Sequence, residues 1–229
     1  NIVAGAAYEV FVTTQHGRAL SRALATAALL VAAVCLPAVP GAASPFGVNA
    51  HIPPQPVVDE VAAAGIGWVR IDFMWSLVET ERDVYRWEVY DALLDRLEAS
   101  GLRPYATLQA TPAWATAGPE FSGVPRDPDD WQEFVYLAAA RYRGRIPAWG
   151  LWNEPNLPRF WAGTRRQYID TILLPGAQAV RAADPRALIG GPDLAHLSSA
   201  DWDSWLRQVI AEAGHELDLI AHHAYPGDG

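Results

Sequence analysis

The sequence predicts an α/β fold, a (β/α)8 TIM barrel of which about six βα units are present. From Phe46 onward, short apolar runs alternate with amphipathic segments, which is the pattern of a parallel sheet covered by helices. The Gly-rich turn GxGxxG, typical of a doubly wound sheet, is absent. Successive apolar runs begin roughly 22–44 residues apart, near the ~31 expected when about 250 residues build eight units.

The apolar runs are the predicted strands, and each of them leads into polar or aromatic residues. Their composition suits strands that are buried on both faces of a parallel sheet. They are FGVNAH (46–51), WVRIDF (68–73), RPYATLQ (103–109), IPAWGLW (146–152), ALIGG (187–191) and DLIAHH (218–223).

The segments between these runs are predicted helices. In the third of them, Trp131, Phe134, Val135 and Ala138 recur at i, i+3, i+4 and i+7, which is one face of a helix. Pro175 is expected to kink or end the fourth, because proline has no N–H and its ring clashes with the preceding turn. The helical segments are residues 57–65, 90–101, 127–144, 165–184 and 201–214.

Six units leave such a barrel two units short, and two more would need about 60 further residues. We therefore expect the chain to be a fragment of a longer barrel, cut before a seventh strand. An open sheet has unpaired strand edges, and this predicts poor solubility.

The chain is acidic, with 26 Asp and Glu residues against 17 basic ones, all of them Arg. A net charge of −9 argues against nucleic acid or an anionic membrane surface as a partner. About half of the residues are hydrophobic, which excludes disorder as the default. The 10 Trp residues are an unusual number, and the flat apolar face of Trp suits sugar rings as well as protein cores.

Residues 1–43 are interpreted as an N-terminal extension with a secretory signal peptide at about residues 16–43. Arg18 and Arg22 precede the apolar stretch 23–36, and small residues follow up to Ala43, where cleavage is expected. The apolar stretch is too short to span a bilayer, so we expect a secreted protein without stable membrane insertion. A buried core helix is the alternative. Residues 44–229 form the predicted barrel domain.

Polar and aromatic side chains gather where the predicted strands end. The carboxyl ends of barrel strands form the face that carries active sites, so these side chains are expected to converge on one rim. Among them, Glu154 directly follows the fourth strand, where a buried carboxylate needs partners. The set comprises Asn49, His51, Arg70, Asp72, Trp75, Gln109, Trp114, Asn153, Glu154, Asp193, His222, His223 and Tyr225.

The motif WNEPN (152–156) resembles the acid/base motif of the retaining glycoside hydrolases of clan A, families such as 5 and 39. The motif alone is moderately specific, and its place at the fourth strand of an alternating βα pattern makes the likeness strong. The similarity covers about residues 46–227, through GVNAH (47–51), VRIDFMW (69–75), TPAWA (111–115), GGP (190–192) and HHAY (222–225).

The resemblance implies hydrolysis of O-glycosidic bonds in oligo- or polysaccharides by a retaining double displacement, without a cofactor. Glu154 is then the acid that protonates the leaving oxygen and afterwards the base that activates water. Asn153 would bond the sugar 2-hydroxyl, Arg70 would orient the nucleophilic carboxylate, and Tyr225 would hydrogen-bond to that carboxylate. The remaining implied substrate contacts are His51 and His223 around the reacting sugar, and Trp75, Trp114 and Trp161 as stacking platforms.

Each role has a structural alternative. Glu154 could be a salt-bridge partner, Arg70 could form a plain ion pair with Asp72, and Asp193 could cap the loop after the fifth strand. Each Trp, taken singly, favours a core position over a platform.

The two neighbouring histidines cannot share one role. Side chains alternate along a strand, so one of His222 and His223 points outward, and we expect His223 to point inward. A metal centre is disfavoured, because the first strand has a single histidine without the His-x-His spacing of metal-dependent barrel hydrolases.

Retaining hydrolysis needs a second carboxylate about 5–5.5 Å from the first, acting as the nucleophile. The resemblance places it at the end of the seventh strand, past Gly229, and neither Asp193 nor Asp228 is assigned the role. Two functions therefore remain open. One is a secreted retaining glycoside hydrolase, present here as a fragment that is inactive alone, and the other is a non-catalytic carbohydrate-binding barrel.

Overall fold

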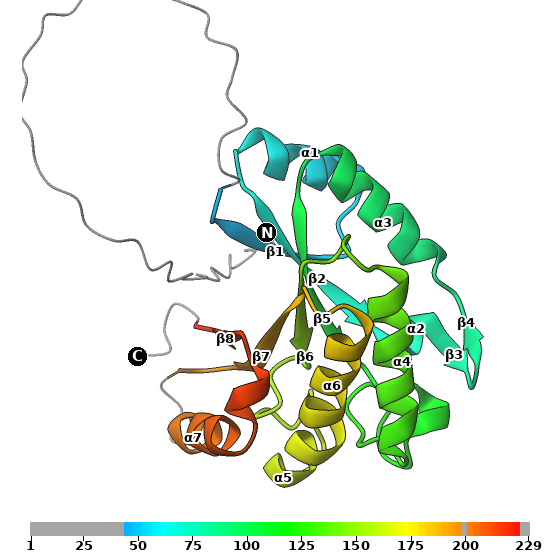
Figure 1. Cartoon of the computed structure of the whole chain (residues 1–229), viewed down its shortest axis with the longest axis vertical. Coiled ribbons are helices and arrows are strands. Elements are labelled where there is room, and N and C mark those ends of the chain that lie inside the picture. The colour runs from blue at the N-terminus through cyan, green and yellow to red at the C-terminus, as the bar shows by residue number, and fades with distance from the viewer. Residues whose placement is uncertain (1–43, 198–200, 225–229) are drawn as a thin grey trace, which may run out of the picture.

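The computed structural model describes residues 44–197 and 201–224 (Figure 1). A parallel six-stranded sheet lies at its centre, with the strands in the order β1-β2-β5-β6-β7-β8. They are β1 (Gly47–His51), β2 (Trp68–Met74), β5 (Arg103–Gln109), β6 (Ala148–Leu151), β7 (Leu188–Leu194) and β8 (Leu219–His222).

Neighbours in this sheet are also consecutive along the chain, which is the strand order of a barrel wall. A doubly wound sheet would instead reverse its order at a switch point. Helices cover the outer side of the curved sheet (Figure 1). The predicted fold class, an α/β barrel of the (β/α)8 type with six units present, is confirmed.

All described helices except the short one at Trp75–Val78 lie where the sequence predicts them, with ends shifted by a few residues. Two short 3₁₀ turns are also present, at Ala113–Ala115 and Gly214–Glu216. The helices are α1 (Gln55–Ala63), α2 (Trp75–Val78), α3 (Glu88–Ala99), α4 (Pro128–Arg141), α5 (Arg165–Tyr168), α6 (Leu174–Ala183) and α7 (Trp202–Ala213).

Helix α4 shows how local sequence sets these elements. Asp127 caps it by accepting a hydrogen bond from the Asp129 N–H at 3.0 Å. Pro128 occupies the first turn, where the missing N–H costs nothing. The four residues of the predicted apolar face, Trp131, Phe134, Val135 and Ala138, are fully buried.

Pro175 interrupts the fourth predicted helix without ending it. A π-helical turn, Ile169–Leu173, joins α5 to α6 and absorbs the proline in the first turn of α6. The Trp131 indole donates a hydrogen bond to the Ile172 carbonyl at 2.9 Å, so this carbonyl is satisfied inside the core. The expected kink is therefore a local change of helix type.

A hairpin between β2 and α3 was not predicted. Its strands, β3 (Glu79–Glu81) and β4 (Val84–Tyr85), pair antiparallel and are too short to show an alternating pattern. Glu79 anchors it from within, accepting hydrogen bonds from the Trp75 indole at 2.7 Å and the Asp83 N–H at 2.9 Å. Burial raises the pKa of the Glu79 carboxyl.

Helix α3 fixes the end of β2, which carries part of the rim. The Tyr90 hydroxyl donates to the Asp72 carbonyl at 2.9 Å and accepts from the Met74 N–H at 2.7 Å. Its ring stacks on Phe73 with 3.9 Å between the ring centres. The side chain of Tyr90 on α3 thus fixes the backbone of Asp72 and Met74 at the end of β2.

Two glycines make room for Tyr105 of β5 inside the sheet. A Cβ at Gly150 would lie 2.8 Å from the Tyr105 hydroxyl, and one at Gly190 would overlap it. The hydroxyl reaches the Asp193 carboxylate at 3.3 Å. Glycine in β6 and β7 therefore lets a β5 side chain contact a carboxylate on β7.

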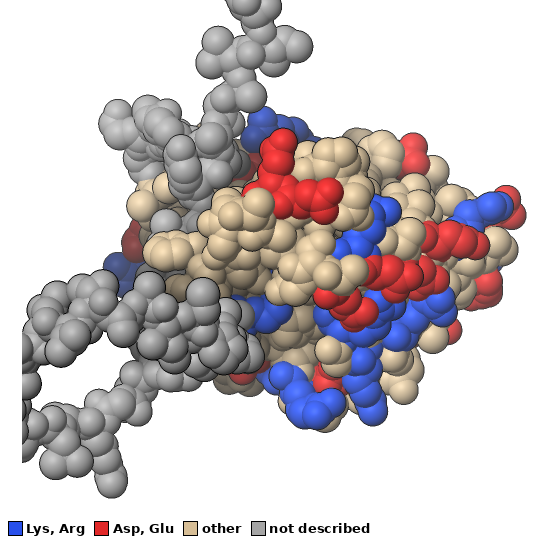
Figure 2. All heavy atoms as spheres, turned by 90° about the horizontal axis from the view of Figure 1, so that it is seen from above, with Lys and Arg blue, Asp and Glu red and all other residues tan. Residues whose placement is uncertain are grey.

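Several pairs of opposite charge lie on the outer surface, and Figure 2 shows acidic and basic side chains next to one another on part of one face. Arg141 pairs with Asp91, and Arg145 pairs with Asp95 and Glu98 of α3. Within the described residues, no helix is long and apolar enough to cross a membrane. The predicted signal peptide and its cleavage site lie outside the described residues.

Candidate active site at the carboxyl end of the strands

Glu154 lies just past the end of β6. The Trp152 N–H still donates to the Leu108 carbonyl of β5, and the Glu154 N–H donates to the Asp193 carbonyl of β7 at 3.0 Å. The Glu154 side chain is only 2% exposed. The residue predicted as the acid/base is therefore buried at the rim and held between the two neighbouring strands.

The backbone around this rim is strained. Positive φ angles occur at His51 (58°), Ala110 (71°), Trp152 (82°), Glu154 (45°) and Asp193 (49°), each within a few residues of the end of a parallel strand. Left-handed backbone is unfavourable for residues other than glycine, by about 1–3 kcal/mol each. Strain of this kind concentrates at functional sites, which favours this rim as the active site.

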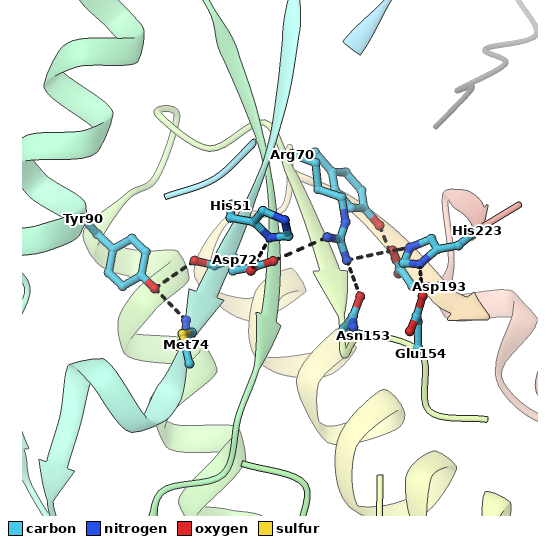
Figure 3. A network of polar contacts seen from close by, with 10 residues as sticks. His51, Arg70, Asp72, Met74, Tyr90, Asn153, Glu154, Asp193 and His223 are labelled. Carbon is cyan, nitrogen blue, oxygen red and sulfur yellow. Dashed lines mark hydrogen bonds and ion pairs between the residues drawn. The ribbon is translucent and has the colours of Figure 1, made fainter. Parts of the chain in front are cut away.

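The two oxygens of the Glu154 carboxylate have different partners. Oε1 lies 2.8 Å from Nδ1 of His223, just past β8 (Figure 3). Oε2 lies 3.2 Å from Nη2 of Arg159 in the loop after β6. His223 is buried whereas its neighbour His222 is exposed, so the prediction that His223 points inward is confirmed.

Arg70 of β2 is buried next to the motif. Its Nη2 donates to the Asn153 Oδ1 at 2.7 Å, and its Nη1 lies 3.5 Å from the Asp72 carboxylate. The Asn153 side-chain oxygen therefore accepts from Arg70, and its amide N–H groups are the donors that this side chain can offer to a ligand. The contact with Asp72 agrees with the alternative that Arg70 forms an ion pair with Asp72. The hydrogen bond to Asn153 is shorter than this contact and ties Arg70 to the motif.

Asp193 belongs to the same network, although the sequence assigned it no site role. It is 1% exposed, and its Oδ1 lies 3.7 Å from Nε2 of His223 and 3.9 Å from Nη2 of Arg70 (Figure 3). It is thus more than a loop cap. Its position before a predicted loop carried no signal of this burial.

His223 bridges two carboxylates. Burial lowers the pKa of its imidazole, but the carboxylates of Asp193 and Glu154 outweigh this and raise the pKa to about 9. The ring is therefore an imidazolium at neutral pH, which donates from Nδ1 to Glu154. A cation fixed on Oε1 orients the Glu154 carboxyl group.

His51 lies at the outer edge of the network. Its Nδ1 contacts the Asp72 Oδ2 at 2.8 Å, and its side chain is 69% exposed. Asp72 in turn links His51 to Arg70 (Figure 3). His51 therefore joins the predicted cluster through Asp72.

Two of the three predicted stacking platforms are wrong. Trp75 is 0% exposed and packs on Phe134, and its indole N–H is bonded to Glu79. Trp161 is 2% exposed and lies edge-on to Trp152 with 5.4 Å between ring centres. Neither ring has a face open to a sugar, because both belong to the core.

Trp114 remains a candidate platform. It is partly exposed, its indole donates to the Glu79 carbonyl, and the guanidinium of Arg82 lies 4.8 Å from its ring centre. Phe121, which the sequence did not suggest, is half exposed and pairs with Thr111 just past β5.

Tyr225 lies outside the described residues, so its predicted contact remains a prediction. Among residues 44–197 and 201–224, no group of three or more His, Cys, Asp or Glu side chains is arranged to hold a metal ion. The chemistry of the rim is that of a buried carboxyl group with cationic and amide neighbours.

The fold and the rim together define a class of protein, a (β/α)8-type barrel with a buried WNEPN carboxylate at the end of its fourth parallel strand. The chain belongs to glycosyl hydrolase family 39, since the sequence profile of that family matches residues 61–229. The resemblance to clan A seen in the sequence is thereby confirmed.

Two curated relatives are β-xylosidases. The chain is 25% identical over 155 residues to one from Geobacillus stearothermophilus, covering 62% of this chain and 31% of the relative. It is 28% identical over 156 residues to one from Caldicellulosiruptor saccharolyticus, covering 60% and 30%. The chain thus spans about a third of the length of the curated relatives it matches.

The solved structures agree on the fold. A monomeric β-xylosidase from Caulobacter crescentus CB15 superposes with a TM-score of 0.63 at 22% identity, over 78% of this chain and 41% of that one. At this identity the likeness concerns the fold, which it supports independently of the sequence profile.

Proposed function

We propose that the protein hydrolyses O-glycosidic bonds in oligo- or polysaccharides with retention of configuration, and that Glu154 is its acid/base. One observation carries the proposal. Glu154 is buried at the active face of the barrel, with Oε1 held by His223 and Oε2 on the side of an exposed loop. A carboxyl group in this setting can pass a proton to a bound leaving group.

In the first step, a carboxylate nucleophile bonds to the anomeric carbon while the bond from that carbon to the leaving oxygen breaks. The leaving oxygen takes the proton of Glu154. In the second step, Glu154 takes a proton from water, and the water oxygen displaces the nucleophile. None of the described residues is assigned as the nucleophile, and Glu154 serves both steps.

The neighbours of Glu154 have supporting roles in this proposal. Asn153, oriented by Arg70, donates to the 2-hydroxyl of the reacting sugar, an interaction that strengthens in the transition state. His223 holds the Glu154 carboxyl in place. His51 and Tyr225 remain candidate contacts for the same sugar.

β-Xylosides are the first substrates to test, because the two curated relatives are β-xylosidases. The full-length protein, which includes the region that carries the nucleophile, is expected to release 4-nitrophenol from 4-nitrophenyl β-D-xyloside, and it is the form used in every activity measurement below. Proton NMR during the first minutes is expected to show β-xylose before the α anomer, because two displacements at one carbon restore its configuration.

First appearance of α-xylose would contradict the retaining mechanism. Binding of xylo-oligosaccharides without cleavage of any aryl glycoside would instead support the carbohydrate-binding alternative. The α-xyloside serves as the control, since it presents the wrong anomer to the same pocket.

We also propose that the protein is exported, with residues 16–43 as its signal peptide. Arginines before a short apolar stretch and small residues after it support this. Mass spectrometry of the protein from the culture medium is expected to find an N-terminus at Ser44. A cell-retained protein that still contains residues 23–36 would contradict it.

A further inference from the structure

The leaving unit of a substrate has to approach Glu154 from the side of Oε2. His223, which pairs with Oε1, is 5% exposed, whereas the Arg159 side chain beside Oε2 is 64% exposed. The proton of a general acid passes directly to the leaving oxygen, which needs an open path. The leaving unit therefore binds next to Arg159.

The backbone that carries Arg159 is fixed on both sides. Before it, the Asn156 side chain forms two hydrogen bonds of 2.9 Å with the backbone of Ala195 past β7. After it, the Phe160 carbonyl accepts from the Trp152 indole at 2.8 Å. The loop after β6 thus presents residue 159 at a defined place on the rim.

The guanidinium of Arg159 has capacity for another partner. It lies 4.7 Å from the ring centre of Phe160 and makes one ion pair, with Glu154, among the described residues. A guanidinium carries five N–H donors in a planar fork that matches a carboxylate. Most of these donors remain for a ligand on the exposed side.

The ion pair with Arg159 conflicts with the role of Glu154 as an acid. A cation next to a carboxyl group favours its ionised form, whereas a general acid must be protonated when the glycosidic bond breaks. A substrate group that drew Arg159 away from Oε2 would remove one of the cationic neighbours of Glu154 at the moment of reaction and leave His223 on Oε1. An anionic group competes most strongly with a carboxylate for a guanidinium, because its hydrogen bonds are charge-assisted on both sides.

We propose that Arg159 determines specificity on the leaving-group side and selects substrates whose leaving unit carries a carboxylate, such as a uronic acid or a carboxylated phenol. The inference rests on the proposed glycosidase function, because it concerns the part of the same site that binds the leaving unit. The carboxylate of the leaving unit pairs with the Arg159 fork, and Oε2 of Glu154 is then free of its cation and faces the leaving oxygen.

The test compares two β-xylosides that differ in one group, with 4-nitrophenol or 5-hydroxy-2-nitrobenzoate as the leaving unit. The wild-type protein is expected to favour the carboxylated substrate in kcat/KM by about fivefold, the upper end for an exposed ion pair. Arg159→Gln should bring the ratio close to one, and Arg159→Lys should restore part of it. Arg186→Gln is the matched control, since this exposed residue precedes β7 at the opposite end of the strands.

A ratio that is unchanged in Arg159→Gln, or a wild-type preference for the neutral leaving group, would overturn the proposal. Calorimetric titration with the two free phenols gives a second readout that needs no turnover. The carboxylated phenol is expected to bind the wild type about fivefold more tightly than it binds Arg159→Gln. If neither xyloside is cleaved, the choice of substrate fails, while equal binding to both proteins would refute the role of Arg159.

Discussion

Replacement of Glu154 by glutamine is expected to lower kcat/KM by about 10³-fold for glycosides with poor leaving groups, within the range that general acids contribute. Glutamine keeps the shape of the side chain and can still contact His223, so the side chain is expected to stay in place although the ion pair is lost. It has no carboxyl proton to give. The effect is therefore specific to the chemical step.

The dependence on leaving group separates this role from a structural one. A 2,4-dinitrophenyl glycoside departs without a proton, so its kcat/KM is expected to fall by at most about tenfold in the same variant. Glu133→Gln, which changes an exposed glutamate on α4, is the control and should match the wild type. Equal losses for both leaving groups would show that Glu154 is not the acid.

A rise from about pH 6 to about pH 9.5 is expected to lower the free energy of unfolding by about 3 kcal/mol through His223. The pKa of His223 is raised to about 9 in the folded protein, from its ordinary value of 6.5. A raised pKa stabilises the fold below pH 6.5, and that stabilisation is lost as the pH passes through 9. The carboxylates of Glu154 and Asp193 and the guanidinium of Arg70 are the charges that face this ring.

Urea unfolding at several pH values measures this effect, with His223→Gln as the variant. The difference in unfolding free energy between wild type and variant should be largest near pH 6 and should shrink toward pH 9.5. His215→Gln, at an exposed histidine, is expected to keep the wild-type pH profile. A variant profile parallel to that of the wild type would mean that His223 does not carry the charge.

The repeating elements were predictable because each carries its own local signal. The face of α4 from Trp131 to Ala138 has the period of a helix, and it is buried as expected. The inward orientation of His223 follows from the alternation of side chains in β8. The hairpin of β3 and β4 escaped prediction, since strands of two or three residues show no period.

The candidate site was predictable only where a motif or a strand end marked it. Glu154, Asn153, Arg70 and His223 do meet, since parallel strands deliver their carboxyl ends to one rim. Asp193 was expected at the rim as well, because it follows the fifth predicted strand, but its contacts with Tyr105, His223 and Arg70 were not predicted.

The prediction that Trp75 and Trp161 are stacking platforms was wrong for a related reason. A sequence gives the residue type and strand position of Trp75 and Trp161, but it does not give the direction of their rings. The ring of Trp75 turns toward Phe134 and that of Trp161 toward Trp152, so both fill the core. Arg159 likewise gained its role only from the fold of the loop that brings it to Glu154.

The left-handed backbone at Trp152, Glu154 and Asp193 makes the rim a place where selection for heat resistance and selection for turnover oppose each other. Glycine at any of these positions would relax the chain, but it would also remove the side chain that the position exists to present. Improvements in robustness that leave turnover intact should therefore accumulate in the outer layer, on helices such as α3 and α4. The rim itself should tolerate the fewest changes in the whole chain.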